Sequence, residues 1–280
     1  MIEAVLPFFS PEKIADSGQA FRIHMLDSTH AETVAFGRYL QIADMGDSRY
    51  AFSCTADEFA GIWSAYFDLN RDYEKVVSSI DRNDNYLLSA AEFGIGIRIL
   101  RQEVFETAIS YIISQRRSIP SITTAVERIC SLCGEKIVPY APEPVFTAPS
   151  QNEFYAFPTP VRLAELSIED LTATGVGYRA PYIARAASDF SSGKLIPDEL
   201  AELPDSDLYR ILMSMYGVGM KVANCIMLFA FARTSRFPVD VWIARIVDTY
   251  YGGNFDASRY PDSAGIMQQF MFYYERKRIS

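Results

Sequence analysis

The stretch from Met213 to Val247 constrains the fold of this chain more than any other, because it places two short helical patterns on either side of one glycine turn. The first helix is predicted by four apolar residues at helical spacing, Leu208, Ile211, Leu212 and Met215. Gly217-Val218-Gly219 ends it, because glycine adopts backbone angles that strain other residues. The helical spacing then resumes at Val222, Cys225, Ile226 and Phe229. The stretch therefore predicts a helix-hairpin-helix, whose unpaired N–H groups at the second helix attract phosphate.

Two ionisable residues follow the hairpin. Lys221 falls in the first turn of the second helix, where the helix dipole disfavours an ammonium and so favours the neutral amine that a nucleophile needs. Asp240 comes before the apolar pattern of a third helix, which it is expected to cap while its carboxylate faces a neighbouring site. Alone, these features fit an ordinary turn, a surface lysine and a plain helix cap. Their order and spacing together are more specific.

In this order, the motif resembles the helix-hairpin-helix family of DNA base-excision glycosylases, and within it the 8-oxoguanine DNA glycosylases. The resemblance implies a bifunctional enzyme that flips and excises 8-oxoguanine from duplex DNA and then cleaves the strand as an AP lyase. By resemblance, Lys221 is the nucleophile that forms a Schiff base, and Asp240 is the essential carboxylate. A lysine at this place argues against the related glycosylases for alkylated purines, which usually rely on aspartate alone.

The two parts of the chain differ in pattern. Strand-like segments separated by polar residues occupy Phe21–Leu26, Thr33–Ile42 and Arg49–Cys54, and Thr55 is expected to cap a helix over Asp57–Phe67. Helical spacing dominates from Glu103 onward. We therefore expect an α+β fold, with an antiparallel sheet in residues 1–95 and an all-helical part in residues 96–280. The resemblance makes these a TBP-like domain and an HhH-GPD glycosylase domain.

The resemblance also predicts a base pocket. Gly18, in the segment Ser17 to Arg22, takes the place of a glycine whose carbonyl accepts a hydrogen bond from N7–H of the oxidised guanine. Normal guanine has a lone pair at N7 that would repel this carbonyl. Cys225 and Phe272 correspond to the two walls of the pocket, and Gln268 to a glutamine on the Watson–Crick edge of the base. Without the resemblance, a turn glycine and a core phenylalanine would explain Gly18 and Phe272 equally well.

Further positions are predicted to contact DNA. Arg116 and Arg117 stand where the family's best-known members have asparagines, one of which fills the gap left by the flipped base. We expect Arg116 in that gap, with phosphate binding by both arginines as the alternative. By resemblance, Tyr178 wedges into the base stack and Arg179 contacts the orphaned base. Predicted phosphate contacts are the hairpin residues Gly217 and Gly219 and, near the 5′ phosphate, Trp242.

Charge and cysteine content limit the partners and cofactors. The net charge of −9 is unusual for a general nucleic-acid binder, so local charge must bring the phosphates to the site. The pair Cys130 and Cys133 has no second pair or nearby histidine, and we expect both to be buried on a helix. No cysteine follows Cys225, which argues against the family's iron–sulfur branch, and no cofactor is expected. By resemblance, the carbonyls of Met213, Met215 and Val218 could hold a monovalent cation.

The expected partner is double-stranded DNA with a damaged base, bound by a monomer. The chain opens on no signal-peptide pattern and contains no apolar run long enough for a bilayer, so we expect an intracellular protein, in cytoplasm, nucleoid or nucleus, without a membrane partner. Three alternatives remain from sequence: a glycosylase for alkylated or other damaged purines, a non-catalytic binder of damaged DNA, and a helical enzyme of small-molecule metabolism. The second predicts DNA binding without excision, and the third predicts no DNA affinity.

Overall fold

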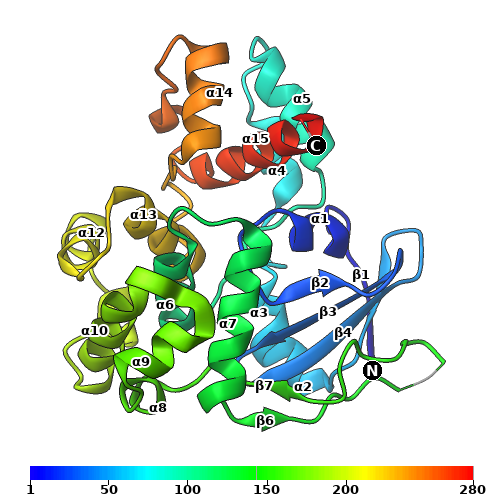
Figure 1. Cartoon of the computed structure of the whole chain (residues 1–280). Helices are drawn as coiled ribbons and strands as arrows, with labels where there is room; N and C mark the ends of the chain where they lie inside the picture. The colour runs from blue at the N-terminus through cyan, green and yellow to red at the C-terminus, as the bar shows by residue number, and fades with distance from the viewer. Residues whose placement is uncertain (143, 280) are drawn as a thin grey trace.

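A computed structural model of the chain describes residues 1–142 and 144–279. Figure 1 shows an antiparallel sheet on one side, a group of helices beside it, and a smaller helical group that contains the C-terminus. Helix α7 (Ile119–Cys133) runs between the sheet and the neighbouring helices (Figure 1). Within the described ranges, no helix is both long and apolar enough to cross a bilayer.

The sheet has five strands in the order β1-β5-β4-β3-β2. In chain order the strands are β1 (Ile2–Val5), β2 (Ile23–Met25), β3 (His30–Ala35), β4 (Arg38–Asp44) and β5 (Arg49–Phe52). Helix α1 (Pro11–Asp16) packs against β2 and β3, and Ser10 caps it by accepting from Lys13 N at 3.2 Å. The antiparallel sheet expected in the N-terminal part is therefore confirmed, and β1 is a strand that the sequence pattern did not indicate.

The segment Thr33–Ile42, expected as one strand, is a hairpin. Strands β3 and β4 pair directly, with Ala35 opposite Arg38, so only Phe36 and Gly37 form the turn. Both have left-handed φ angles, +52° at Phe36 and +65° at Gly37, which is the backbone that a two-residue hairpin requires. Phenylalanine rarely adopts this conformation, so Phe36 is not an ordinary turn residue and does not indicate a hairpin.

The helix that Thr55 was expected to cap exists, but one turn of it is π-helical. Thr55 and Glu58 form a capping box, and α2 (Ala56–Glu58), the π-helical turn η1 (Phe59–Trp63) and α3 (Ser64–Tyr66) follow without a break. This arrangement buries Trp63 completely, with Tyr66 and Phe67 beside it in the core of the sheet domain. The interruption is typical of a π-bulge, which helical spacing alone cannot predict.

The remaining elements are mostly helical, as expected from Glu103 onward. They comprise α4 (Tyr73–Ser78), α5 (Asn85–Gly94), α6 (Val104–Ser114), α7 (Ile119–Cys133), β6 (Lys136–Ile137), β7 (Phe154–Tyr155), α8 (Pro160–Ala164), α9 (Ile168–Leu171), η2 (Thr172–Val176), η3 (Gly177–Arg179), α10 (Ala180–Ser191), α11 (Pro197–Ala201), α12 (Asp205–Ser214), α13 (Met220–Phe229), α14 (Val241–Tyr251), η4 (Ala257–Arg259) and α15 (Ala264–Ile279). Helix α6 is buried from Phe105 to Ile113 except at Glu106, so it is the central helix of this core. Cys130 and Cys133 are buried on α7, as expected.

The helical core also includes residues that precede position 95. Helix α5 packs against α15, and Leu87 and Ala91 of α5 are fully buried in the helical core. Figure 1 accordingly shows α4 and α5 beside α14 and α15. The predicted domain boundary at residue 95 places α4 and α5 in the N-terminal domain. Their packing, however, makes them part of the core of the helical domain.

Candidate active site

One cavity of about 940 Å³ lies where the sheet domain and both helical groups meet. Its lining comes from five parts of the chain: the end of α1 with the turn after it, the end of α6 with the α6–α7 loop and the start of α7, α13, the start of α14 with the residues before it, and α15. The predicted catalytic and base-pocket residues all line it, namely Gly18, Lys221, Cys225, Asp240, Gln268 and Phe272. The volume is within the range of small-ligand pockets and is large enough to enclose one nucleobase.

The glycine hairpin between α12 and α13 forms as predicted. Gly217 has a φ of +82°, and a Cβ placed on it would lie 2.4 Å from ring atoms of Tyr182. The hairpin thus needs glycine both for its backbone angle and for its packing. Gly219 is the extended N-cap residue of α13, so the N–H groups of the first turn of α13 have no helical partner.

Lys221 lies in the first turn of α13 and extends into the cavity. Its Nζ atom is 5.0 Å from the centroid of the Tyr111 ring. Cys225 follows one turn later on the same side of the helix. Burial raises the pKa of the Cys225 thiol to about 11, with a smaller opposing effect of the Lys221 charge. The thiol is therefore uncharged at neutral pH and provides an apolar wall.

Asp240 caps α14, as predicted, and also reaches the cavity. Its Oδ1 atom accepts hydrogen bonds from the backbone N–H groups of Trp242 at 3.0 Å and Ile243 at 2.9 Å. Within the described chain, its Oδ2 atom accepts no hydrogen bond. The helix N-terminus therefore fixes the carboxylate while one oxygen remains available to a positive charge in the cavity.

The base-pocket residues lie around the turn that follows α1. Gly18 has a φ of +73°, and a Cβ there would lie 2.9 Å from Ile119 Cδ1 and 3.3 Å from Phe272 Cε1. The glycine backbone thus forms one surface of a narrow slot next to the Phe272 ring. Gln268 is 4% exposed, and its Oε1 atom accepts from Nε2 of Gln269 at 2.9 Å. The Oε1 atom of Gln269 is buried without a partner among the described residues, so it is an acceptor at the cavity.

The two predicted arginines of the α6–α7 loop differ in their surroundings. Arg116 is exposed and has a left-handed φ of +53°, an unusual conformation for a non-glycine residue. Arg117 is partly buried and donates from Nη2 to the carbonyl of Gly175 at 2.7 Å. Arg116 is therefore available at the mouth of the cavity, whereas Arg117 ties the loop to the turn that contains Tyr178.

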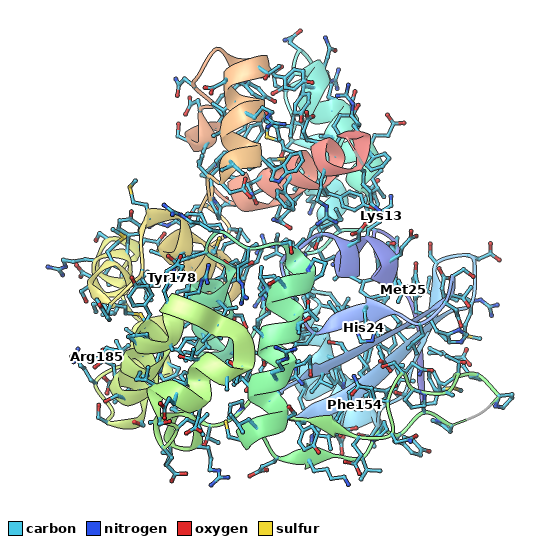
Figure 2. All side chains as sticks on the ribbon, in the orientation of Figure 1. Lys13, His24, Met25, Phe154, Tyr178 and Arg185 are labelled. Atoms are coloured by element: carbon cyan, nitrogen blue, oxygen red, sulfur yellow. The ribbon has the colours of Figure 1, made fainter. Side chains whose placement is uncertain are left out.

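The turn before α10 presents one of its two predicted DNA-contacting side chains. Tyr178, labelled in Figure 2, is 55% exposed and packs edge-on against Tyr182. Arg179, in contrast, is 5% exposed and donates to the carbonyls of Val176 and Gln115. Its guanidinium therefore braces the end of α6 and the α6–α7 loop, and the contact of Arg179 with an orphaned base stays a prediction.

The monovalent-cation site at the hairpin carbonyls of Met213, Met215 and Val218 stays a prediction. The carbonyl of Met215 accepts a hydrogen bond from Val218 N at 3.1 Å, so it already has one partner. Among the described residues, no group of three His, Cys, Asp or Glu side chains could hold a metal ion.

Besides Gln269, sequence reasoning missed three residues of this site. Tyr111 contacts Lys221, and Arg276 and Asp16 form an ion pair at the edge of the Gly18 slot. Arg276 also lies with its guanidinium 5.6 Å from the Phe272 ring centroid. The available signals were weak: Arg276 falls one helical turn after Phe272, and Tyr111 lies on a mostly apolar helix.

Comparison with known proteins agrees with this geometry. Residues 5–108 match the family model for the N-terminal domain of 8-oxoguanine DNA glycosylase, and residues 109–261 match that of HhH-GPD superfamily base excision DNA repair proteins. A probable N-glycosylase/DNA lyase of Methanothermobacter thermautotrophicus is 30% identical over 75% of this chain and 73% of its own length. The N-glycosylase/DNA lyase of Saccharomyces cerevisiae is 34% identical, over 56% of this chain and 42% of its own.

Solved structures of similar proteins cover almost the whole chain. The 8-oxoguanine glycosylase/lyase of Clostridium acetobutylicum, bound to duplex DNA with cytosine opposite 8-oxoguanine, superposes with a TM-score of 0.89 at 30% identity. The alignment covers 98% of this chain and 94% of that one. MBOgg1 bound to a low-affinity DNA ligand gives the same TM-score at 34% identity and the same coverage. A 3-methyladenine DNA glycosylase of Archaeoglobus fulgidus, 19% identical with a TM-score of 0.76, shares the fold.

Proposed function

The chain belongs to the HhH-GPD superfamily of base-excision DNA repair proteins, in its 8-oxoguanine glycosylase branch, and we propose that it excises 8-oxoguanine from duplex DNA and then cleaves the strand as an AP lyase. One observation carries the proposal: a single cavity holds the Lys221 amine, the Asp240 carboxylate and a slot between Gly18 and Phe272. A nucleophile, a charge stabiliser and a base-sized pocket are what such a reaction requires.

Recognition of the damaged base rests on the slot. The Gly18 carbonyl accepts the N7–H that only the oxidised guanine carries, while Cys225 and Phe272 hold the two faces of the base. The uncharged Cys225 thiol suits this role, because a thiolate would repel the electron-rich base. Gln268 contacts the Watson–Crick edge, and the unpartnered Oε1 atom of Gln269 offers a second acceptor for the base N–H groups.

Excision begins when the neutral Lys221 amine attacks C1′ of the flipped nucleotide. The new N–C bond forms as the N-glycosidic bond breaks, and the electron pair of that bond leaves with the base, which then takes a proton. Asp240 stabilises the positive charge that develops on the sugar, and its fixed position on α14 means that little reorganisation is needed.

Strand cleavage follows from the covalent intermediate. The sugar ring opens to give a protonated imine between Lys221 and C1′, which acidifies the C2′ proton. Loss of that proton expels the 3′ phosphate by β-elimination, and water then releases the lysine.

The DNA-binding surface surrounds the mouth of the cavity. Hairpin amides at Gly217–Gly219 and the start of α14 near Trp242 contact phosphates, Tyr178 wedges into the stack, and Arg116 enters the gap beside the orphaned base. Arg117 and Arg179 support this surface from behind, because both donate to loop carbonyls. The protein acts as a monomer, without a cofactor or a membrane partner, in the compartment that holds the DNA.

An activity panel tests the proposed function. The purified chain is incubated with duplexes that contain 8-oxoguanine, an alkylated purine, an abasic site or only normal bases, each opposite all four partners. We expect cleavage of the 8-oxoguanine and abasic duplexes, loss of both with Lys221→Gln, and intact normal DNA. Cleavage of the alkylated duplex alone, or binding without any excision, would overturn the proposal in favour of the corresponding alternative.

A further inference from the structure

Tyr111 is a buried residue that contacts both the proposed nucleophile and the turn that forms the base pocket. It lies on α6 and lines the cavity, although only 3% of its surface is exposed. Its ring lies 5.0 Å from Lys221 Nζ and stacks on Phe229, with centroids 5.5 Å apart and planes 9° from parallel. Its hydroxyl donates to the carbonyl of Gln19 at 3.0 Å. One side chain therefore touches the nucleophile and the residue that follows Gly18.

The Gln19 peptide is held on several sides. Its carbonyl accepts a second hydrogen bond from Gln102 Nε2 at 2.9 Å. The Gln19 side chain donates to the carbonyl of Arg98 at 2.8 Å and accepts from Leu100 N at 2.8 Å. Because the Gly18 carbonyl belongs to the peptide that joins Gly18 to Gln19, fixing Gln19 also fixes the direction of that carbonyl.

The same network reaches the helix that carries Lys221. Gln102 N donates to the carbonyl of Phe229, the last residue of α13, at 2.8 Å. Phe229 in turn stacks on Tyr111. Tyr111 and Gln102 thus connect the Gly18–Gln19 turn to α13, the helix that carries Lys221, and hold the two in place relative to each other.

The hydroxyl and the ring of Tyr111 have separable roles. Burial keeps the pKa of the Tyr111 hydroxyl well above its ordinary value, so it remains a donor to Gln19 at every working pH. The ring face attracts a cation, which at this place is the protonated imine that forms on the Lys221 nitrogen after attack. The positive charge of the imine lies on the Lys221 nitrogen, whose Nζ atom is 5.0 Å from the centroid of the Tyr111 ring.

We propose that Tyr111 is a positioning residue for both steps, its hydroxyl holding the Gly18–Gln19 turn for base recognition and its ring holding the Lys221 nitrogen for strand cleavage. The inference rests on the proposed function, since it assigns Tyr111 a part in each of the two reactions. A tyrosine that only filled the core would affect both reactions equally, through stability.

The test separates the two roles by substrate. Wild type, Tyr111→Phe and Tyr111→Leu are compared under single-turnover conditions on an 8-oxoguanine duplex and on an abasic-site duplex, which needs no base recognition. Tyr111→Phe should excise 8-oxoguanine about fivefold more slowly, as expected for one lost hydrogen bond, and cleave the abasic site within about twofold of wild type. Tyr111→Leu should slow both reactions, and its borohydride-trapped adduct with abasic DNA should fall about tenfold.

Tyr50→Phe is the matched control. Tyr50 is also a buried tyrosine, and its hydroxyl donates to the carbonyl of Phe9 at 2.6 Å in the core of the sheet domain. It should lose a similar amount of thermal stability and keep both activities. If Tyr111→Phe changes both reactions equally, or neither, the inference is wrong, and this holds even if Tyr111→Leu fails to fold. If wild type itself cleaves neither duplex, the proposed function fails instead.

Discussion

Replacing Gly18 by alanine tests whether the turn after α1 shapes the base pocket. Gly18 has a φ of +73°, where alanine costs about 1–2 kcal/mol. The added Cβ would also lie 2.9 Å from Ile119 Cδ1, 3.3 Å from Phe272 Cε1 and 3.4 Å from Arg276 Nη1. The Ile119 methyl is the end of a flexible side chain and can turn away. The Phe272 ring has to move by a few tenths of an ångström, and this changes the width of the slot.

We expect Gly18→Ala to excise 8-oxoguanine much more slowly than its reduced stability alone would explain. A shift of a catalytic contact by about 1 Å can cost about a hundredfold in rate, so we expect 8-oxoguanine excision by Gly18→Ala to fall at least about tenfold. Cleavage of an abasic site should remain within about threefold of wild type, because no base enters the slot. Single-turnover rates on the two duplexes, with a thermal melt of each variant, measure this.

Gly37→Ala is the control for backbone strain. Gly37 has a comparable φ of +65° in the β3–β4 turn, and a Cβ there would meet nothing within 4 Å. Each substitution should lower the melting temperature by about 2–4 °C for each kcal/mol of strain, but only Gly18→Ala should lose excision. If the two variants excise 8-oxoguanine equally well, Gly18 does not shape the slot and its assignment is wrong.

Three further variants or reactions test other parts of the account. Arg116 has a φ of +53°, so Arg116→Gly should stabilise the fold by about 1 kcal/mol in a denaturant titration. The same variant should bind an abasic duplex more weakly in a gel shift. Unchanged binding would show that Arg116 does not belong to the DNA-binding surface. Gly217→Ala should destabilise by about 1–3 kcal/mol and reduce DNA affinity, because its Cβ would lie 2.4 Å from the Tyr182 ring; wild-type affinity would argue against the hairpin contact. With a pKa of about 11, roughly one Cys225 thiol in a thousand is ionised at pH 8. Alkylation of Cys225, followed by mass spectrometry, should therefore be slow at pH 8 and should accelerate as the pH rises toward 11. Rapid alkylation at pH 8 would contradict the burial of the thiol.

Local signals made the hairpin and its two ionisable residues predictable. Gly217 ends one helical pattern, and Asp240 stands directly before another, so neither depends on distant parts of the chain. The resemblance then located Gly18, Cys225, Gln268 and Phe272, which lie far apart in sequence but line one cavity.

What depends on packing between distant segments could not be predicted. The sequence around Tyr111 fits any buried helix, and only the fold brings its ring to Lys221 and its hydroxyl to Gln19. Arg179 follows an exposed tyrosine, yet it is buried and donates hydrogen bonds to the carbonyl of Gln115 at the end of α6 and to that of Val176. Likewise, α5 packs against α15, although the two helices lie far apart in the sequence, and the local spacing of apolar residues does not predict such a contact.

Borohydride trapping on a duplex with 8-oxoguanine opposite cytosine tests the central claim most directly. Sodium borohydride reduces a protonated imine to a stable amine, so a Schiff base becomes a covalent protein–DNA adduct. We predict an adduct with wild type, none with Lys221→Gln, and a tryptic peptide that places the sugar on Lys221. An adduct that persists in Lys221→Gln, or none with wild type while the strand is still cleaved, would contradict the account.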